Sequence, residues 1–239
     1  MGVGRGPPSL YRGKDSVKGT ERERTRGMIV PSTRAWYATL KGRRTARRLA
    51  RVVAPAIRFG PMQRLFALGY APPILTGLDP SRLERLTVLL TAAPPHRWPA
   101  RGANHAAATR ADSLPLPPNL FDQALLIHAL EHADAPAVLA EVWRALAPAG
   151  ELVLIVPNRL GRWLDPGSPF AQGEAYTEGE LDALLSEARF EVRSQHTALG
   201  GLAPRVRLAL AVKTDGLAPT LVGRVAAAPA PVLGGLVPA

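Results

Sequence analysis

Two histidines and a glutamate stand close together near the middle of the chain, as His128-Ala-Leu-Glu131-His132. This His-x-x-Glu-His spacing is that of the inverted zinc-peptidase motif, where imidazoles bind the metal and the carboxylate acts as a base. That chemistry needs all three side chains on one helix face and a further ligand downstream. Residues 121–127, just before His128, form an apolar run typical of a strand. We therefore expect a strand-to-helix turn here, predict no metal site, and keep a zinc hydrolase as a minor alternative.

The same position gives His128 another interpretation. Ligands of open α/β sheets bind beyond the carboxyl ends of the strands, and a histidine there could line a cleft or accept a proton. It could equally be a turn histidine bonded to backbone groups. Glu131 and His132 are expected to begin a helix rather than to take part in chemistry.

The composition removes several kinds of site. The 239 residues include no cysteine, which excludes disulfides, thiolate zinc sites and thiol nucleophiles. No apolar stretch is long enough for a spanning helix, and the N-terminus lacks the apolar region of a secretory signal. We expect a soluble cytoplasmic protein.

Positive charge is concentrated at the N-terminal end. Residues 1–58 hold 15 of the 30 Lys and Arg but 3 of the 19 Asp and Glu, whereas the remainder is close to neutral. We predict a disordered basic extension over residues 1–27, with Met28 as an alternative start, and a basic amphipathic helix at Arg43–Ala54. Its arginines could hold nucleic-acid phosphates or acidic lipid headgroups, or could form the solvated face of a packed helix. A nucleic-acid partner is possible through this basic segment, but the sequence does not favour one.

Short apolar strands alternate with helix-like segments over the rest of the chain. This alternation predicts an α/β fold, a three-layer sandwich with a mainly parallel sheet. The predicted domain covers residues 28–213, and an Ala/Pro/Gly-rich tail covers residues 214–239. The strand candidates are Gln63–Leu68, Leu86–Leu90, Phe121–Ile127, Glu151–Val156, Phe190–Arg193 and Val206–Val212.

Two helices can be predicted in detail. An apolar stripe runs through residues 135–146, with Asp134 as the expected cap and Pro136 in the first turn. The second helix, over residues 177–189, opens with Thr177-x-x-Glu180, the pattern of a capping box.

The stretch from Leu114 to Gly150 contains the most specific pattern. It has a Leu-Pro element, a Phe-Asp strand ending near Leu-Glu-His, and the turn Arg-Ala-Leu-Ala-Pro-Ala-Gly over residues 144–150. In this order the motifs resemble the second half of the class I S-adenosylmethionine-dependent methyltransferase domain, of the methyltransferase type 11-like kind. The resemblance covers roughly residues 62–212 and implies a Rossmann-like methyltransferase fold, S-adenosylmethionine as cofactor, and methyl transfer to an acceptor that the motifs do not identify.

The cofactor half departs from the family pattern. Where the family has a glycine-rich loop, this chain has Ala67-Leu-Gly-Tyr-Ala-Pro-Pro73, with one of three glycines, and Thr91 follows the second strand instead of an acid. The resemblance implies that the cofactor would lie against the residues Gly69, Tyr70, Ala71, Asp112, Ser113, Leu114 and His128. We expect an enzyme that binds its cofactor weakly; the alternative is a catalytically inactive methyltransferase-like domain with a binding or regulatory role.

Overall fold

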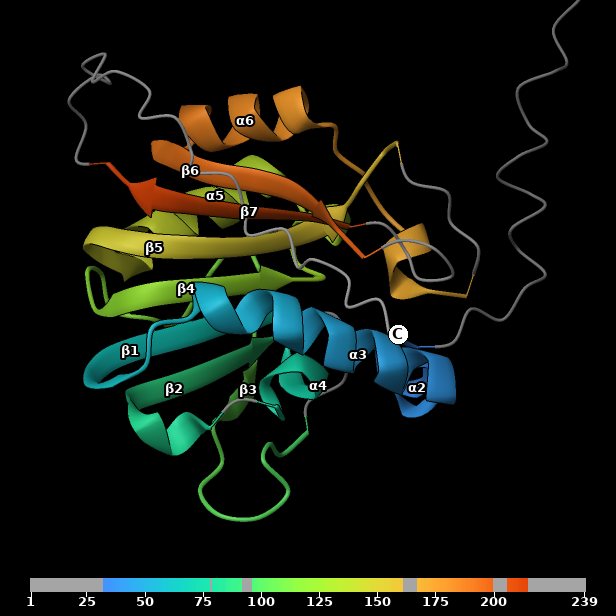
Figure 1. Ribbon diagram of the computed structural model, residues 1–239. Coiled ribbons are helices and arrows are strands. Elements are labelled where there is room, and N and C mark those ends of the chain that lie inside the picture. The colour runs from blue at the N-terminus through green and yellow to red at the C-terminus, as the bar shows by residue number, and fades with distance from the viewer. Residues whose placement is uncertain (1–31, 78, 92–95, 161–166, 200–205, 215–239) are drawn as a thin grey trace, which may run out of the picture. The chain divides into compact units, whose positions relative to one another are not determined.

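A computed structural model describes residues 32–77, 79–91, 96–160, 167–199 and 206–214. The predicted extension at residues 1–27, the start at Met28 and the tail beyond Thr214 lie outside these ranges. Seven strands form one sheet in the order β3-β2-β1-β4-β5-β7-β6, in which only β7 runs antiparallel to its neighbours (Figure 1). The strands are β1 (Gly60–Gly69), β2 (Leu83–Leu90), β3 (Ala106–Ala108), β4 (Phe121–Ile127), β5 (Leu146–Pro157), β6 (Phe190–Ala198) and β7 (Val206–Lys213).

All six predicted strands are confirmed, and β4 has the predicted bounds. The strand β5 begins earlier than predicted, at Leu146 rather than Glu151. The sequence analysis missed β3, because its three alanines at the edge of the sheet carry no hydrophobic alternation.

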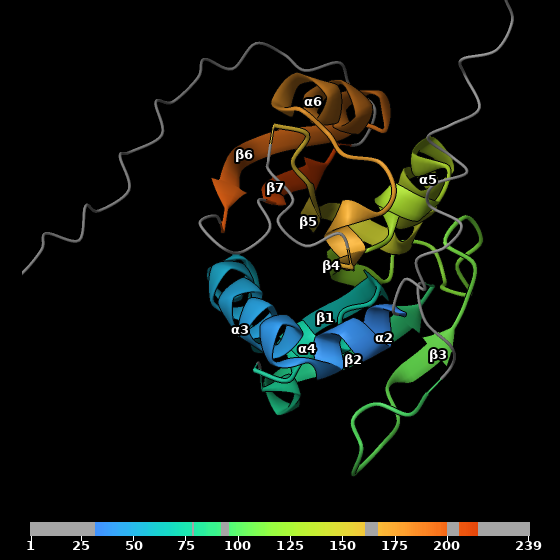
Figure 2. The same cartoon turned by 90° about the vertical axis from the view of Figure 1, so that its right-hand side faces the viewer.

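Helices cover both faces of the sheet, as the predicted three-layer sandwich requires (Figure 2). Side chains alternate between the faces along each strand, so that Phe66 and Leu68 of β1 enter one core and Leu65 and Ala67 the other. The first core packs against α5 (Ala135–Ala145) and α6 (Glu178–Glu187). The second packs against α2 (Thr33–Ala38), α3 (Leu40–Val53) and α4 (Pro72–Leu75).

The helix predicted at residues 43–54 is α3, which begins three residues earlier. The Thr39 hydroxyl accepts a hydrogen bond from the Gly42 amide at 3.0 Å and caps the helix. A side chain at Gly42 would collide with the Trp36 carbonyl, so this glycine lets α2 and α3 pack closely together.

The predicted capping box of α6 is confirmed. The Thr177 amide donates to the Glu180 carboxylate at 2.8 Å, and the Glu180 amide donates to the Thr177 hydroxyl at 3.3 Å. The prediction for α5 needs a correction, because Asp134 occupies the cap position without making a side-chain cap hydrogen bond. The helix also ends at Ala145, since Leu146 pairs with Phe121 and already belongs to β5. Within the described residues, no helix is both long and apolar enough to cross a lipid bilayer.

Candidate functional site

The strands β1 and β4 lie side by side and parallel, so the turns that follow them meet at one edge of the sheet. The Tyr70 amide, directly after β1, donates a hydrogen bond to the Ile127 carbonyl at the end of β4 at 2.9 Å. Gly69 has a φ of +101°, and a Cβ atom there would collide with the same carbonyl. Glycine is therefore needed at this position to bring the two turns together.

His128 is the first residue after β4, and its backbone has a φ of +56°. Left-handed backbone is uncommon in residues other than glycine and is concentrated at functional sites. The His128 side chain is buried, and both of its ring nitrogens have partners. Nδ1 lies 3.0 Å from Glu131 Oε1, and Nε2 lies 2.9 Å from the Tyr37 hydroxyl of α2. We call these three side chains the Tyr–His–Glu chain.

The donor and acceptor roles in the Tyr–His–Glu chain follow from chemistry. A Glu131 carboxylate can only accept, so Nδ1 of His128 donates to it. Burial in the first place, and the Glu131 charge in the second, raise the pKa of the Tyr37 phenol well above its usual value. Tyr37 therefore keeps its proton, and its hydroxyl donates a hydrogen bond to Nε2 of His128. This assignment leaves Nε2 as the proton-accepting nitrogen of the ring.

Aromatic rings surround this chain. The Phe170 ring lies 4.3 Å from the His128 ring, and the Tyr70 ring lies 5.8 Å from the Tyr37 ring, centroid to centroid. Tyr70 also contacts His96 at 5.9 Å. Polar groups enclosed by such rings interact more strongly than in water, because the local dielectric is low.

Glu131 is a functional candidate that the sequence analysis considered only within the zinc motif and did not connect with His128 otherwise. It was expected to begin a helix, whereas the structure places it in a 3-10 turn (Leu130–His132), with its side chain fully buried against His128. One of its oxygens, Oε2, is buried and has no hydrogen-bond partner. The spacing of three residues between His128 and Glu131 is the signal that could have revealed the pair.

The zinc interpretation does not agree with this geometry. His128 follows a strand and His132 lies exposed in the next turn, so the two imidazoles do not share a helix face. In the parts of the chain that the structure describes, no group of three or more His, Asp and Glu side chains could hold a metal ion.

The turn after β1 offers a cofactor few hydrogen bonds. Tyr70 and Ala71 are buried, and α4 begins with Pro72 and Pro73, which have no amide hydrogen. At the end of β2, the Thr91 amide donates to the Gly69 carbonyl at 3.2 Å, and Thr91 has no carboxylate to receive ribose hydroxyls. The turn thus keeps the glycine of a cofactor loop but lacks the donors and the acid.

The predicted adenine contacts are brought to the loop before β4, in two different environments. Asp112 is at the surface, where a bidentate bond from Arg110, at 2.9 and 2.7 Å, lowers the pKa of its carboxyl group. Leu114 is buried, and its amide already donates to Glu141 Oε2 at 2.8 Å. Ser113 is exposed, and its carbonyl accepts from the Thr109 hydroxyl at 3.2 Å. The residues fit the cofactor only partly, since the Leu114 amide is already bonded within the protein.

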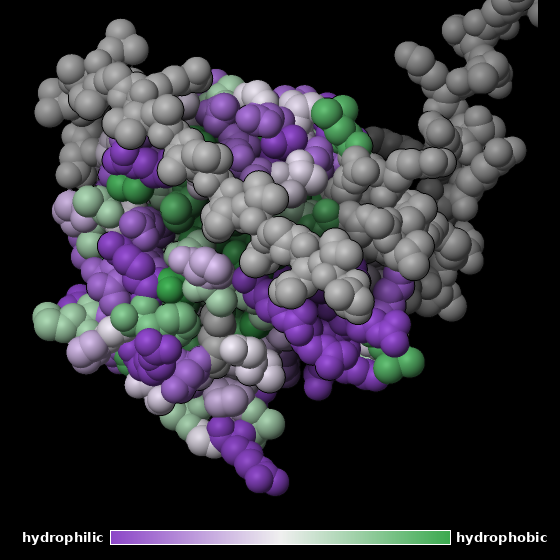
Figure 3. All heavy atoms as spheres, viewed as in Figure 1, coloured by the Kyte–Doolittle hydropathy of each residue, from purple (hydrophilic) through white to green (hydrophobic). Residues whose placement is uncertain are grey.

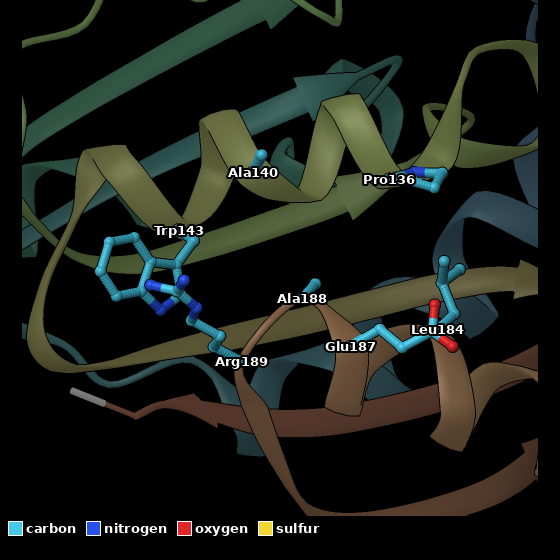
Figure 4. A pocket seen from close by; sticks show the side chains of 7 residues that line it. All are labelled: Pro136, Ala140, Trp143, Leu184, Glu187, Ala188 and Arg189. Atoms are coloured by element: carbon cyan, nitrogen blue, oxygen red, sulfur yellow. The ribbon is translucent and has the colours of Figure 1, made fainter. Parts of the chain in front are cut away.

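A separate hollow of about 420 Å³ lies between α5 and α6 and contains none of the predicted site residues (Figure 4). Trp143 and Arg189 lie together at one end of it, with the guanidinium 5.6 Å from the ring centroid. The Trp143 indole donates to the Thr214 carbonyl at 3.3 Å. These contacts tie α5 to the start of β6 and the end of β7, which is a structural role.

Comparison with solved structures supports the fold. Burkholderia thailandensis 1,6-didemethyltoxoflavin-N1-methyltransferase, with bound 1,6-didemethyltoxoflavin and S-adenosylhomocysteine, aligns at a TM-score of 0.58 and 20% identity, over 84% of this chain and 93% of that chain. A Thermotoga maritima S-adenosylmethionine-dependent methyltransferase, described as a possible histamine N-methyltransferase, aligns at a TM-score of 0.55 and 17% identity, over 75% of this chain and 93% of that chain. Streptomyces coelicolor geranyl diphosphate C-methyltransferase aligns at a TM-score of 0.51 and 12% identity, over 70% of this chain and 78% of that chain.

No curated protein matches the sequence significantly. The comparison with protein-family models gives a more specific result than the solved structures do. Residues 63–154, from β1 to β5, match the family model described as a methyltransferase domain. This segment contains the turn after β1, the Leu114 loop, and the pair formed by His128 and Glu131. Residues 63–154 therefore belong to the methyltransferase domain family, and the chain has the fold of the class I S-adenosylmethionine-dependent methyltransferases.

Proposed function

We propose that this protein is an S-adenosylmethionine-dependent methyltransferase in which His128 accepts a proton from the methyl acceptor. The observation that carries the proposal is the buried pair of His128 and Glu131 at the end of β4, at the sheet edge where α/β folds bind ligands. Bound S-adenosylmethionine would supply a methyl group on an activated sulfonium. Positioning and exclusion of water then provide most of the rate, so one proton acceptor is all that the protein has to add.

Glu131 is a positioning residue in this proposal. Its carboxylate holds the proton on Nδ1 of His128 and orients the ring, which leaves Nε2 free of a proton. The Tyr37 hydroxyl occupies Nε2 in this structure, so Tyr37 has to leave that nitrogen before an acceptor can reach it. The Tyr70 ring packs beside Tyr37 and the Phe170 ring beside His128, so both would lie close to an acceptor that reaches Nε2.

We further propose that the acceptor is a small molecule. The printed names of the neighbours give a toxoflavin precursor, geranyl diphosphate and, as a possibility, histamine as substrates of those proteins. These neighbouring proteins include an N-methyltransferase and a C-methyltransferase. The fold alone therefore does not set the acceptor, and we expect the residues that follow β4 to do so.

Calorimetric titration of the full chain with S-adenosylmethionine and with S-adenosylhomocysteine tests the proposal. We expect weak binding, in the high micromolar to millimolar range, because the contacts missing at Pro72, Pro73 and Thr91 are worth about 1.5–3 kcal/mol for a charged group. Tyr70→Ala is expected to weaken binding further, and the surface variant Glu187→Gln to leave it unchanged. His128→Asn is expected to keep cofactor binding and to lose methyl transfer.

The alternative is a methyltransferase-like domain that has lost catalysis and serves in binding or regulation. The two prolines after Ala71 and the occupied Leu114 amide favour it. If neither form of the cofactor gives a heat signal at millimolar concentration, the catalytic proposal is rejected and this alternative stands.

A further inference from the structure

The exposed side of α3 is the most strongly charged surface among the described residues. Its sequence, Leu-Lys-Gly-Arg-Arg-Thr-Ala-Arg-Arg-Leu-Ala-Arg-Val-Val, contains six basic and no acidic side chains. Figure 3 shows hydrophilic side chains gathered over the part of the molecule where α3 lies in Figure 1. All six basic residues are exposed, and we call them the α3 basic face: Lys41, Arg43, Arg44, Arg47, Arg48 and Arg51.

The basic face is fixed in place by the opposite side of the helix. Ala46, Leu49 and Val53 are buried in the core beneath α3, and Gly42 packs on the backbone of α2. The helix therefore cannot turn its arginines towards the protein. Their direction is set by the fold, and they are presented outward as one rigid surface.

Nothing in the described part of the chain neutralises the middle of this face. Four arginines (44, 47, 48 and 51) form no ion pair with any described carboxylate. They also lie three and four residues apart, the spacing at which like charges on a helix repel. By contrast, Arg58, just beyond the helix, pairs with Glu151 at 3.2 Å. An anionic partner would relieve the repulsion within α3.

The shape of the face favours a partner with charges on two sides. At about 100° per residue, the six cations cover roughly 160° of the helix circumference, centred opposite the buried side. A flat anionic surface would contact mainly the cations along the middle of this arc. The major groove of B-form DNA instead admits an α-helix and places phosphates along both of its walls, where the cations on both sides of the arc can reach them. An open surface hollow of about 260 Å³, lined by Arg47 and Arg51 together with Ala50, Ala54 and Gly77, offers room for a phosphate group.

The cations themselves match this partner. Five of the six are arginines, whose planar guanidinium groups bind phosphates in a bidentate manner, more rigidly than lysine does. The helix has no Asn, Gln, Asp or Glu to read adenine or cytosine, and its repelling cations are matched best by phosphates, so we expect most of its contacts to be to the DNA backbone. We propose that the α3 basic face binds the phosphate backbone of duplex DNA.

Fluorescence anisotropy with a labelled 20-base-pair DNA of mixed sequence tests this, using the full chain at 50–200 mM KCl. The quadruple variant R44Q/R47Q/R48Q/R51Q is compared with R85Q/R97Q/R101Q/R193Q, which removes the same charge from other exposed positions. We expect the α3 variant to bind at least tenfold more weakly at 100 mM KCl. Its slope of log K against log salt should be shallower by up to about 3.6, at about 0.9 per phosphate contact. The control variant should show a much smaller loss of affinity and a much smaller change in the salt slope.

Three results would overturn the proposal. One is an equal loss of DNA affinity in both quadruple variants, which would mean that net charge alone drives binding. The second is no binding of wild-type protein to the duplex at 50 mM KCl. The third is sedimentation with phosphatidylglycerol vesicles, lost in the α3 variant, without binding to DNA. Circular dichroism and urea unfolding of both variants confirm that each is folded before its affinity is interpreted. None of these measurements depends on methyltransferase activity.

Discussion

The turns after β1 and β4 lie next to each other at the same sheet edge, yet they are built from different chemistry. The β1 turn is Gly-Tyr-Ala-Pro-Pro, without a charged side chain and with two residues that lack an amide hydrogen. The β4 turn carries His128 and Glu131, both buried and bonded to each other. The turn that would hold a cofactor thus has few polar groups, whereas the turn that would do chemistry contains two members of the Tyr–His–Glu chain.

The two turns also depend on each other. The hydrogen bond from the Tyr70 amide to the Ile127 carbonyl joins them, and Gly69 allows the close approach. A change in the turn after β1 should therefore disturb the turn after β4, which mutations can test.

Gly69→Ala is expected to have the largest effect. The new Cβ atom would collide with the Ile127 carbonyl, and φ is +101°, so we expect a loss of about 3 kcal/mol or more in the free energy of unfolding. Urea unfolding measures it. The control is Gly179→Ala in α6, where a Cβ meets nothing within 4 Å, and a small gain in stability is expected. Equal stability of Gly69→Ala and wild type would show that the two turns are not packed as described.

Breaking the Tyr–His–Glu chain should have the next largest effect. Glu131→Leu and Tyr37→Phe each leave one buried ring nitrogen of His128 without its partner, at a cost of about 1–3 kcal/mol. Because the two residues bond to opposite nitrogens of one ring, the double variant should lose less than the sum of the two single variants. A thermodynamic cycle from chemical unfolding checks this. Strict additivity would mean that His128 does not couple them.

Adding a carboxylate beside the apolar turn should strengthen cofactor binding. Thr91→Asp places a carboxylate after β2, where the family has one to receive ribose hydroxyls. We expect about tenfold tighter binding of S-adenosylhomocysteine by calorimetry, equivalent to about 1.4 kcal/mol. Thr91→Asn is the uncharged control. Unchanged affinity in Thr91→Asp would place the cofactor away from the end of β2.

Alkaline pH should produce the smallest effect. Burial raises the pKa of Tyr37 well above its usual value and that of Tyr176 to about 12. Since these phenols hold their protons more tightly in the folded state, the stability they contribute is complete below about pH 10 and falls as the pH rises above it. The difference in unfolding free energy between wild type and Tyr37→Phe should therefore shrink between pH 9 and 11. A constant difference would mean that Tyr37 titrates normally.

Strands and helices with strong local signals were predictable, and weak or long-range ones were not. The apolar runs of β4 and β5 and the capping box at Thr177 and Glu180 each act over a few residues, so the sequence reveals them. The three alanines of β3 and the four-residue α4 carry no comparable pattern. Asp134 matched the cap pattern, but its side chain does not bond to the helix, because a pattern gives position and not side-chain direction.

The alternating α/β order, the buried faces of the helices, the positive charge near the N-terminus and the place of His128 at a strand end all follow from the amino-acid sequence. The partners of His128 follow only from the folded structure. Glu131 is three residues away and Tyr37 is ninety-one residues away, and the sheet edge and α2 bring them to one ring. Local spacing specifies elements, whereas hydrogen bonds between distant residues depend on how those elements pack, and this is why Tyr37 had no signal in the sequence.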